Sequence, residues 1–150
     1  MREESKESFG VTCFSKKFDN IVMWSHYSDK HRGVCLKFDI LADADFFTTP
    51  YIVDYQKYPT FNYIRNRDGL AKFLLETKSI EWNYEDEIRV MKRNAGFYSF
   101  KKDSLVEIIF GAKVINSEKD NIKDMVVEFD YQKTNFKTAK LSETDFKLEF

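Results

Sequence analysis

Short runs rich in apolar residues and bounded by turn residues recur along the chain, and at 146–150 apolar and polar residues alternate with the period of two that is typical of strands. Such runs predict strands over residues 11–15, 34–39, 52–55, 87–91, 105–110 and 146–150. The run at 105–110 reads LVEIIF and stops at Gly111. Several short strands are therefore expected from one end of the chain to the other.

Three other segments place apolar residues three and four positions apart, which predicts amphipathic helices. The first covers residues 21–28 and follows Asp19 and Asn20, either of which can cap it. The second covers residues 68–79, and the third starts from a cap at Ser117. The expected buried stripes are Leu70, Phe73, Leu74 and Thr77, then Ile122, Met125, Val126 and Phe129. Strands interrupted by helices without a regular βαβ rhythm predict an α+β fold, with a mixed, mainly antiparallel sheet and about three helices.

Composition narrows the class of protein. The 150 residues fit a single domain spanning residues 1–150, and an aromatic content of 17% excludes a disordered chain. With 24 basic and 25 acidic side chains, the net charge of −1 argues against a nucleic-acid partner and against an anionic membrane. The polar N-terminus, and the lack of an apolar run of about 18 residues, predict a cytoplasmic protein without a membrane span.

The two cysteines, Cys13 and Cys35, both lie in apolar runs. Inside a cell such thiols stay reduced, so the sequence favours two buried, passive cysteines. A zinc site formed with His26 and His31 is the weaker alternative, because the spacing matches no familiar module. No metal site is therefore expected.

Polar groups gather among aromatic residues in residues 23–35, which contain both histidines of the chain. His26 and His31 are candidate catalytic groups, and Trp24 and Tyr27 are candidate walls of a cleft. The simpler alternative makes the histidines ordinary surface or hydrogen-bonded residues, and makes Trp24 and Tyr27 core anchors of a short helix.

A second cluster occupies residues 78–90, where Glu85, Glu87 and Arg89 share one face of a strand. Trp82 and Tyr84 lie beside them in the sequence. The pattern alone favours a solvated row of ion pairs, each contributing less than about 1 kcal/mol. The alternative is a site in which Arg89 orients Glu87 toward a bound substrate.

These segments, with two others, carry a resemblance to a known family. The motifs are CFS at 13–15, MWSHY at 23–27, HRGVCLKFD at 31–39, K-S-x-x-W-x-Y-E-x-E-x-R at 78–89 and EIIFG at 107–111. In this order they resemble the bacterial family called domain of unknown function 2971. Members usually begin with a further strand, a helix and an Asn-Asp-Pro type motif. The resemblance thus implies that this chain is the C-terminal two-thirds of the family's domain.

More distantly, the layout resembles the ADP-ribosyltransferase fold, in which a catalytic glutamate begins a strand. On this resemblance Glu87 would stabilise the oxocarbenium-like transition state of NAD. Tyr27 or Trp24 would stack on the nicotinamide, and the ribose clamp would lie in the missing N-terminal portion. NAD is the one cofactor that the resemblance implies.

The leading hypothesis is therefore an NAD-using transferase-like enzyme or effector, with a defence or toxin role. Its catalytic residues would be Glu87, His31 and His26, and its substrate-binding residues Trp24, Tyr27, Trp82, Tyr84, Glu85 and Arg89. The alternative is a non-catalytic binding or structural module in which the polar cluster is a buried network. The expected partner is a small molecule or a protein. A protein partner, or a second copy of this chain, would cover the face left open by the missing N-terminal portion of the family's domain.

Overall fold

The computed structural model describes residues 9–150, and their contacts separate into two compact units. Among the described residues, unit 1 consists of residues 9–16 together with Phe47–Tyr98, and unit 2 consists of Lys17–Phe46 and Ser99–Phe150. The expectation of one domain over residues 1–150 stays a prediction. Among residues 9–150, no helix combines the length and the apolar character needed to cross a membrane.

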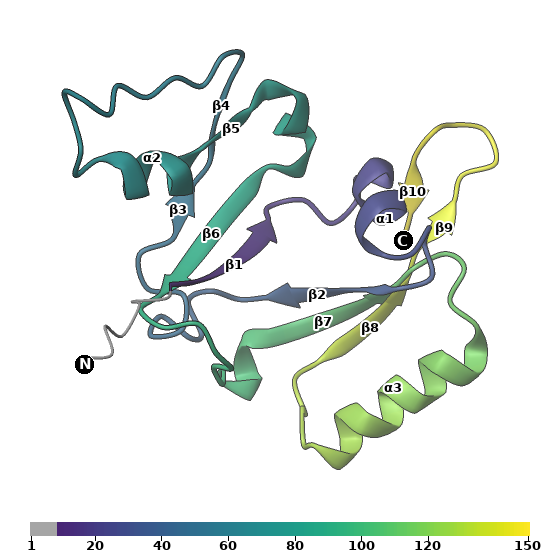
Figure 1. Ribbon diagram of the computed structural model, residues 1–150. Helices are drawn as coiled ribbons and strands as arrows, with labels where there is room; N and C mark the ends of the chain where they lie inside the picture. Colours follow the sequence, from purple (N-terminus) through teal and green to yellow (C-terminus); the bar gives the residue numbers. More distant parts are fainter. Residues whose placement is uncertain (1–8) are drawn as a thin grey trace, which may run out of the picture. The chain divides into compact units, whose positions relative to one another are not determined.

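Unit 1 combines two small sheets with one α-helix and one 3-10 helix (Figure 1). In chain order its elements are β1 (Gly10–Ser15), β3 (Tyr51–Ile52), β4 (Asp54–Gln56), α2 (Leu70–Glu76), β5 (Thr77–Ser79), the 3-10 helix η1 (Ile80–Glu85) and β6 (Glu87–Lys92). β6 lies between β1 and β3 and is antiparallel to both. β4 and β5 pair in parallel. The register of β1 against β6 places Cys13 opposite Arg89.

Unit 2 contains a three-stranded sheet, a two-stranded sheet and two α-helices (Figure 1). Its elements are α1 (Ile21–Tyr27), β2 (Val34–Phe38), the 3-10 helix η2 (Lys102–Ser104), β7 (Leu105–Phe110), α3 (Asn116–Glu128), β8 (Asn135–Thr138), β9 (Lys140–Leu141) and β10 (Leu148–Glu149). β7 is the central strand, antiparallel to β2 and parallel to β8. β9 and β10 pair separately.

The core of unit 2 forms on both faces of β7. One cluster comprises Trp24, Ile109, Ala139 and Leu148, and the other comprises Leu105, Ile108, Phe110 and Val114. Ile21 of α1 packs against the first cluster, and Val126 of α3 packs against the second. Because β7 is covered on both faces, its sequence is nearly continuous in apolar residues instead of alternating.

The α+β fold is confirmed, and so are most of the predicted elements. β7 occupies the predicted residues, and β1, α1, β2 and β6 differ from their predicted bounds by one residue at one end. Asn20 is the cap of α1, because its Oδ1 accepts hydrogen bonds from the backbone N–H groups of Val22 at 2.9 Å and Met23 at 3.1 Å. The sequence could predict this cap because capping involves only residues that are close together in the chain.

The helix predicted over residues 68–79 is shorter than expected. α2 ends at Glu76, and Thr77 starts β5, where it pairs with Asp54 of β4. A β-branched residue suits a strand, and pairing with a distant strand replaces the hydrogen bonds of a further helical turn. Leu74, expected in the buried stripe, is exposed.

Other boundaries also differ from the predictions. The strand expected over residues 52–55 is divided at the buried residue Val53 into β3 and β4. The strand expected over 146–150 is reduced to β10, and β8 and β9 were not predicted, since NFKT in β8 has one apolar residue. α3 starts at Asn116, so Ser117 lies in its first turn and is not the cap.

Some side chains expected in the interior lie at the surface. Phe129 is 53% exposed because α3 ends at Glu128, which takes this residue off the helical stripe. Met125 is exposed as well. Cys13 is exposed on β1, and Cys35 is half-buried against the Trp24 cluster. The prediction of two buried cysteines is therefore wrong for Cys13.

Candidate functional site

A buried carboxylate lies in unit 1 at Glu87, the first residue of β6, which is 5% exposed. Arg89 donates from Nε to Oε1 at 2.8 Å and from a terminal nitrogen to Oε2 at 3.1 Å. The ammonium of Lys78 donates to the same Oε2 at 3.1 Å. The carboxylate is therefore held by a bidentate arginine and a lysine, which is strong, directional pairing.

Glu85, the last residue of η1, lies in the same cluster and is also buried. Its carboxylate pairs with the ammonium of Lys78, and its backbone carbonyl accepts a hydrogen bond from Ser15 Oγ at 2.5 Å. Between the two glutamates, Asp86 has a φ of 44° in the left-handed region, which aspartate adopts more readily than most residues. This turn brings two glutamates from different elements to one lysine.

The cluster also connects the elements of unit 1. Arg89 donates to the backbone carbonyls of Leu74 at 2.8 Å and Leu75 at 3.0 Å, which satisfies carbonyl groups in the last turns of α2. The backbone N–H of Glu87 donates to the hydroxyl of Tyr55 on β4 at 2.9 Å. We call the set Tyr55, Lys78, Glu85, Glu87 and Arg89 the unit 1 network.

Electrostatics fix the protonation states in this network. Burial alone would raise the pKa of Glu87, but hydrogen bonds from Arg89, Cys13 and Lys78 lower it to about 2. Burial would lower the pKa of Lys78, but its bonds to Glu85 and Glu87 raise it. Glu87 and Lys78 therefore carry opposite charges near neutral pH.

Cys13 approaches this network from β1. Partial burial of its thiol, followed by the hydrogen bond to Glu87 and that residue's negative charge, raises the pKa of Cys13 to about 11. Since the thiolate is the nucleophilic form, Cys13 is a passive donor in this position.

An aromatic edge adjoins the network. The ammonium of Lys78 lies 5.0 Å from the ring centroid of Trp82, within cation–π range. The Trp82 and Tyr84 rings are 6.0 Å apart, and Trp82 is 40% exposed. The two aromatic residues predicted from the second cluster therefore lie at the border of the network.

The residues predicted from the first cluster lie in unit 2. His26 and Tyr27 end α1 and are exposed, with ring centroids 6.4 Å apart. Trp24 is buried, and its indole N–H donates to the carbonyl of Phe18 at 2.7 Å. Trp24 is a core anchor of α1, whereas Tyr27, at the surface, is not.

His31 is buried in the turn between α1 and β2, with a φ of 73°. Its Nε2 lies 3.1 Å from Ser25 Oγ, and its carbonyl accepts the backbone N–H of Lys113 at 2.9 Å. Burial, followed by the charge of Lys113, lowers the pKa of His31. A neutral imidazole in a hydrogen-bonded turn is consistent with the simpler of the two alternatives for this residue.

Of the predicted site residues, the structure joins Glu85, Glu87 and Arg89, and it connects Trp82 to them through Lys78. The solvated row of ion pairs is wrong, since both glutamates are buried. The single cleft that would also include His26 and His31 stays a prediction. The sequence did not predict that Tyr55 and Lys78 would be partners of Glu87. Tyr55 lies on β4 and Lys78 on β5, and these strands are brought to β6 only by the fold.

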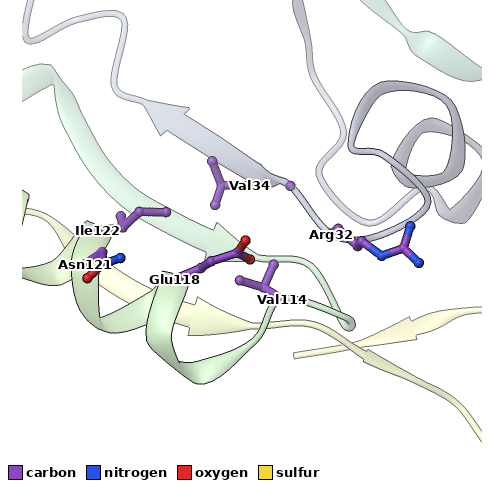
Figure 2. Close-up of a pocket in the computed structure, with 7 residues that line it drawn as sticks. Arg32, Val34, Val114, Glu118, Asn121 and Ile122 are labelled. Carbon is purple, nitrogen blue, oxygen red and sulfur yellow. The ribbon is translucent and has the colours of Figure 1, made fainter.

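A separate open hollow of about 370 Å³ lies in unit 2, where β2 faces α3. Apolar side chains of Val34, Val114 and Ile122 line it, with Glu118 among them, while Arg32 extends away from the other labelled residues (Figure 2). None of the predicted site residues lines this hollow. Across residues 9–150, no group of three or more His, Cys, Asp or Glu side chains is placed to hold a metal ion.

Comparison with known proteins identifies one family. Residues 23–90 match the family described as protein of unknown function (DUF2971). The match begins in α1 and ends in β6, so it includes the MWSHY motif and the segment from Lys78 to Arg89. No curated protein and no solved structure matches the chain. The family resemblance is therefore supported over this stretch, and the resemblance to ADP-ribosyltransferases stays a prediction.

Proposed function

We propose that this chain is a non-catalytic binding or structural module in which the unit 1 network holds the fold together. One observation supports this most strongly: both carboxylate oxygens of Glu87 already accept hydrogen bonds from Arg89 and Lys78, in a position that is 5% exposed. A general acid or base needs to reach a substrate and to exchange a proton near the working pH. A saturated carboxylate with a pKa of about 2 is poorly suited to that task.

The same geometry explains why a structural role requires these residue types. Lys78 lies on β5, Arg89 on β6 and Glu85 on η1, and α2 receives two bonds from Arg89. Four elements are thus tied to one buried carboxylate. Removing one partner of a buried ion pair leaves the other charges uncompensated, which typically costs about 3–5 kcal/mol.

The substitution Glu87→Gln tests this proposal, because it removes the charge and keeps the shape. We expect a loss of about 3 kcal/mol in the free energy of unfolding, measured with urea. Glu81→Gln is the matched control, since it makes the same chemical change at an exposed residue of η1 and should stay within about 0.5 kcal/mol of the unmodified chain. Equal stabilities of the two variants would reject the structural role.

A second candidate is an ADP-ribosyltransferase-like effector that acts on NAD. It is favoured by the permanent negative charge at the start of β6, which would stabilise a developing oxocarbenium ion without any proton transfer. The fit to NAD is incomplete, because Glu87 has little surface to offer a ribose.

Release of nicotinamide from NAD distinguishes the two candidates. The first predicts no release above the rate without protein. The second predicts release that is abolished by Glu87→Gln and kept by Glu81→Gln, measured where both variants are folded by circular dichroism. Release together with an unchanged stability of Glu87→Gln would replace the first candidate by the second.

A further inference from the structure

The loop between β4 and α2, residues 57–69, is the longest connection within unit 1 and contains no helix or strand (Figure 1). Connections longer than about 12 residues without secondary structure of their own are uncommon, and many of the ordered ones are functional. None of the five residues of the unit 1 network lies in this loop, so the composition of the loop needs a separate explanation.

The β4–α2 loop concentrates positive charge. Lys57, Arg65 and Arg67 are exposed and Asp68 is the one acidic residue of the loop, so its net charge is about +2, although the whole chain has a net charge of −1. The overall balance argues against a protein that binds nucleic acid over its whole surface. The net charge of the whole chain does not describe this loop, where an excess of basic side chains can attract a polyanion.

Exposed aromatic rings accompany these cations. Tyr58 is 77% exposed and Tyr63 is 54% exposed, values that leave ring surface available for stacking. The ammonium of Lys57 lies 5.7 Å from the Tyr58 ring centroid, and the guanidinium carbon of Arg67 lies 5.9 Å from that of Tyr63. Each ring therefore has a positive charge beside it, within the range of a cation–π contact.

Local contacts give the β4–α2 loop a defined conformation. Phe61 packs against Phe73 of α2, with ring centroids 5.0 Å apart. Asn62 Oδ1 accepts the backbone N–H of Arg65 at 3.1 Å, and Asn66 Oδ1 accepts that of Gly69 at 3.0 Å. Because these turns already restrict the loop, its tyrosines and arginines lose less conformational entropy when a ligand binds.

We propose that the β4–α2 loop binds single-stranded nucleic acid. Lys57, Arg65 and Arg67 would contact phosphates, while Tyr58 and Tyr63 would each stack on a base. A positively charged track combined with aromatic platforms is the chemistry by which proteins hold single strands without reading their sequence. An acidic peptide would match the cations but would offer no bases to the rings. A membrane surface would require more exposed apolar side chains than Ile64 supplies.

The test measures binding of the full chain to fluorescein-labelled oligothymidylate and oligouridylate of about 12 nucleotides, by fluorescence anisotropy. We expect binding at about 20 mM salt that weakens on addition of salt. The slope of log K against log salt should be no steeper than about −2, because three cations each contribute about −0.7.

Variants locate the binding surface. Replacing Tyr58 and Tyr63 together by alanine should weaken binding about 30-fold or more, and Arg65→Ala should weaken it several-fold and make the salt slope shallower. Tyr98→Ala is the matched control, since Tyr98 is also exposed in unit 1 and has the ammonium of Lys92 5.7 Å from its ring centroid. It should leave affinity unchanged. Unfolding curves verify that each variant is folded.

Three outcomes would overturn the proposal. The first is no binding of either oligonucleotide at about 20 mM salt. The second is binding that the loop variants and Tyr98→Ala reduce equally, which would place the contact elsewhere. The third is tighter binding to polyglutamate or to vesicles rich in phosphatidylserine than to either oligonucleotide, which would assign the loop to an acidic protein or to a membrane.

Discussion

Unit 1 and unit 2 stabilise their central strands in different ways. In unit 2, β7 is covered on both faces by apolar side chains such as Ile109 and Phe110. In unit 1, β6 begins with a buried carboxylate and contains Arg89, so ion pairs and hydrogen bonds occupy part of its interior. Apolar packing is insensitive to pH, whereas a buried carboxylate contributes only while it is ionised. The two units should therefore respond differently to the same perturbation.

The largest effect is expected from Phe110→Ala. Phe110 is 1% exposed and stacks on Phe136, with ring centroids 5.8 Å apart, so truncation leaves a cavity in unit 2. The expected loss is about 4 kcal/mol in the free energy of unfolding, and it should be the same at neutral and acid pH. Urea unfolding measures the loss, and hydrogen exchange shows where protection falls. An equal loss of protection in β6 and β7 would mean that the units unfold as one.

Acid should affect unit 1 before unit 2. The pKa of Glu87 is lowered from 4.5 to about 2 in the folded chain, so its stabilisation is complete above pH 4.5 and is lost as the pH falls toward 2. The loss should be on the order of 2–3 kcal/mol, because the unfolded state takes up its proton at the higher pH. Urea unfolding at several pH values measures it, with Glu87→Gln as the reference that lacks this dependence. If the curves of the two chains stay parallel down to pH 2, the network does not contribute as described.

A smaller effect is expected at the start of α1 in unit 2. Asn20→Ala removes the acceptor for two backbone N–H groups and should cost about 1 kcal/mol in the free energy of unfolding. Asp19→Ala, one residue earlier, is the control and should cost less. A larger loss for Asp19→Ala would contradict the assignment of the cap.

The smallest effect is expected from an ion pair at the surface of unit 1. Lys16 Nζ lies 2.8 Å from Asp86 Oδ1, but both side chains are partly exposed. Lys16→Ala should change the free energy of unfolding by about 0.5 kcal/mol or less, since water and salt screen such pairs. A loss comparable to that of Glu87→Gln would show that burial is not what separates strong from weak ion pairs here.

Sequence patterns predicted the parts of the fold that local residues decide. Asn20 before α1 and Gly111 after β7 are local signals, and both ends lie where they were expected. Thr77 was placed in a helix because its strand exists only through pairing with β4, more than twenty positions earlier. Long-range pairing of this kind leaves no trace in the periodicity of one segment.

The candidate site likewise has parts that local residues decide and parts that depend on distant segments. The two-residue spacing of Glu87 and Arg89 correctly predicted that the two side chains would meet. It did not predict their burial, because burial depends on α2 and β5 packing over that face. Lys78, Glu85 and Glu87 lie on three different elements, so no single strand or helix period predicts that they meet, and the left-handed turn at Asp86 separates the two glutamates.

The pairing of β1 with β6 also determines when unit 1 can form during synthesis. Ser15 pairs with Glu87, and Gly10 pairs with Lys92, so the two strands lie more than seventy residues apart in the chain. Contacts between such distant residues slow folding, because a large loop must close before they form. On the ribosome β1 therefore emerges long before its partner, with its backbone hydrogen-bonding groups exposed. This interval is when the nascent chain is most open to aggregation or to capture by a chaperone.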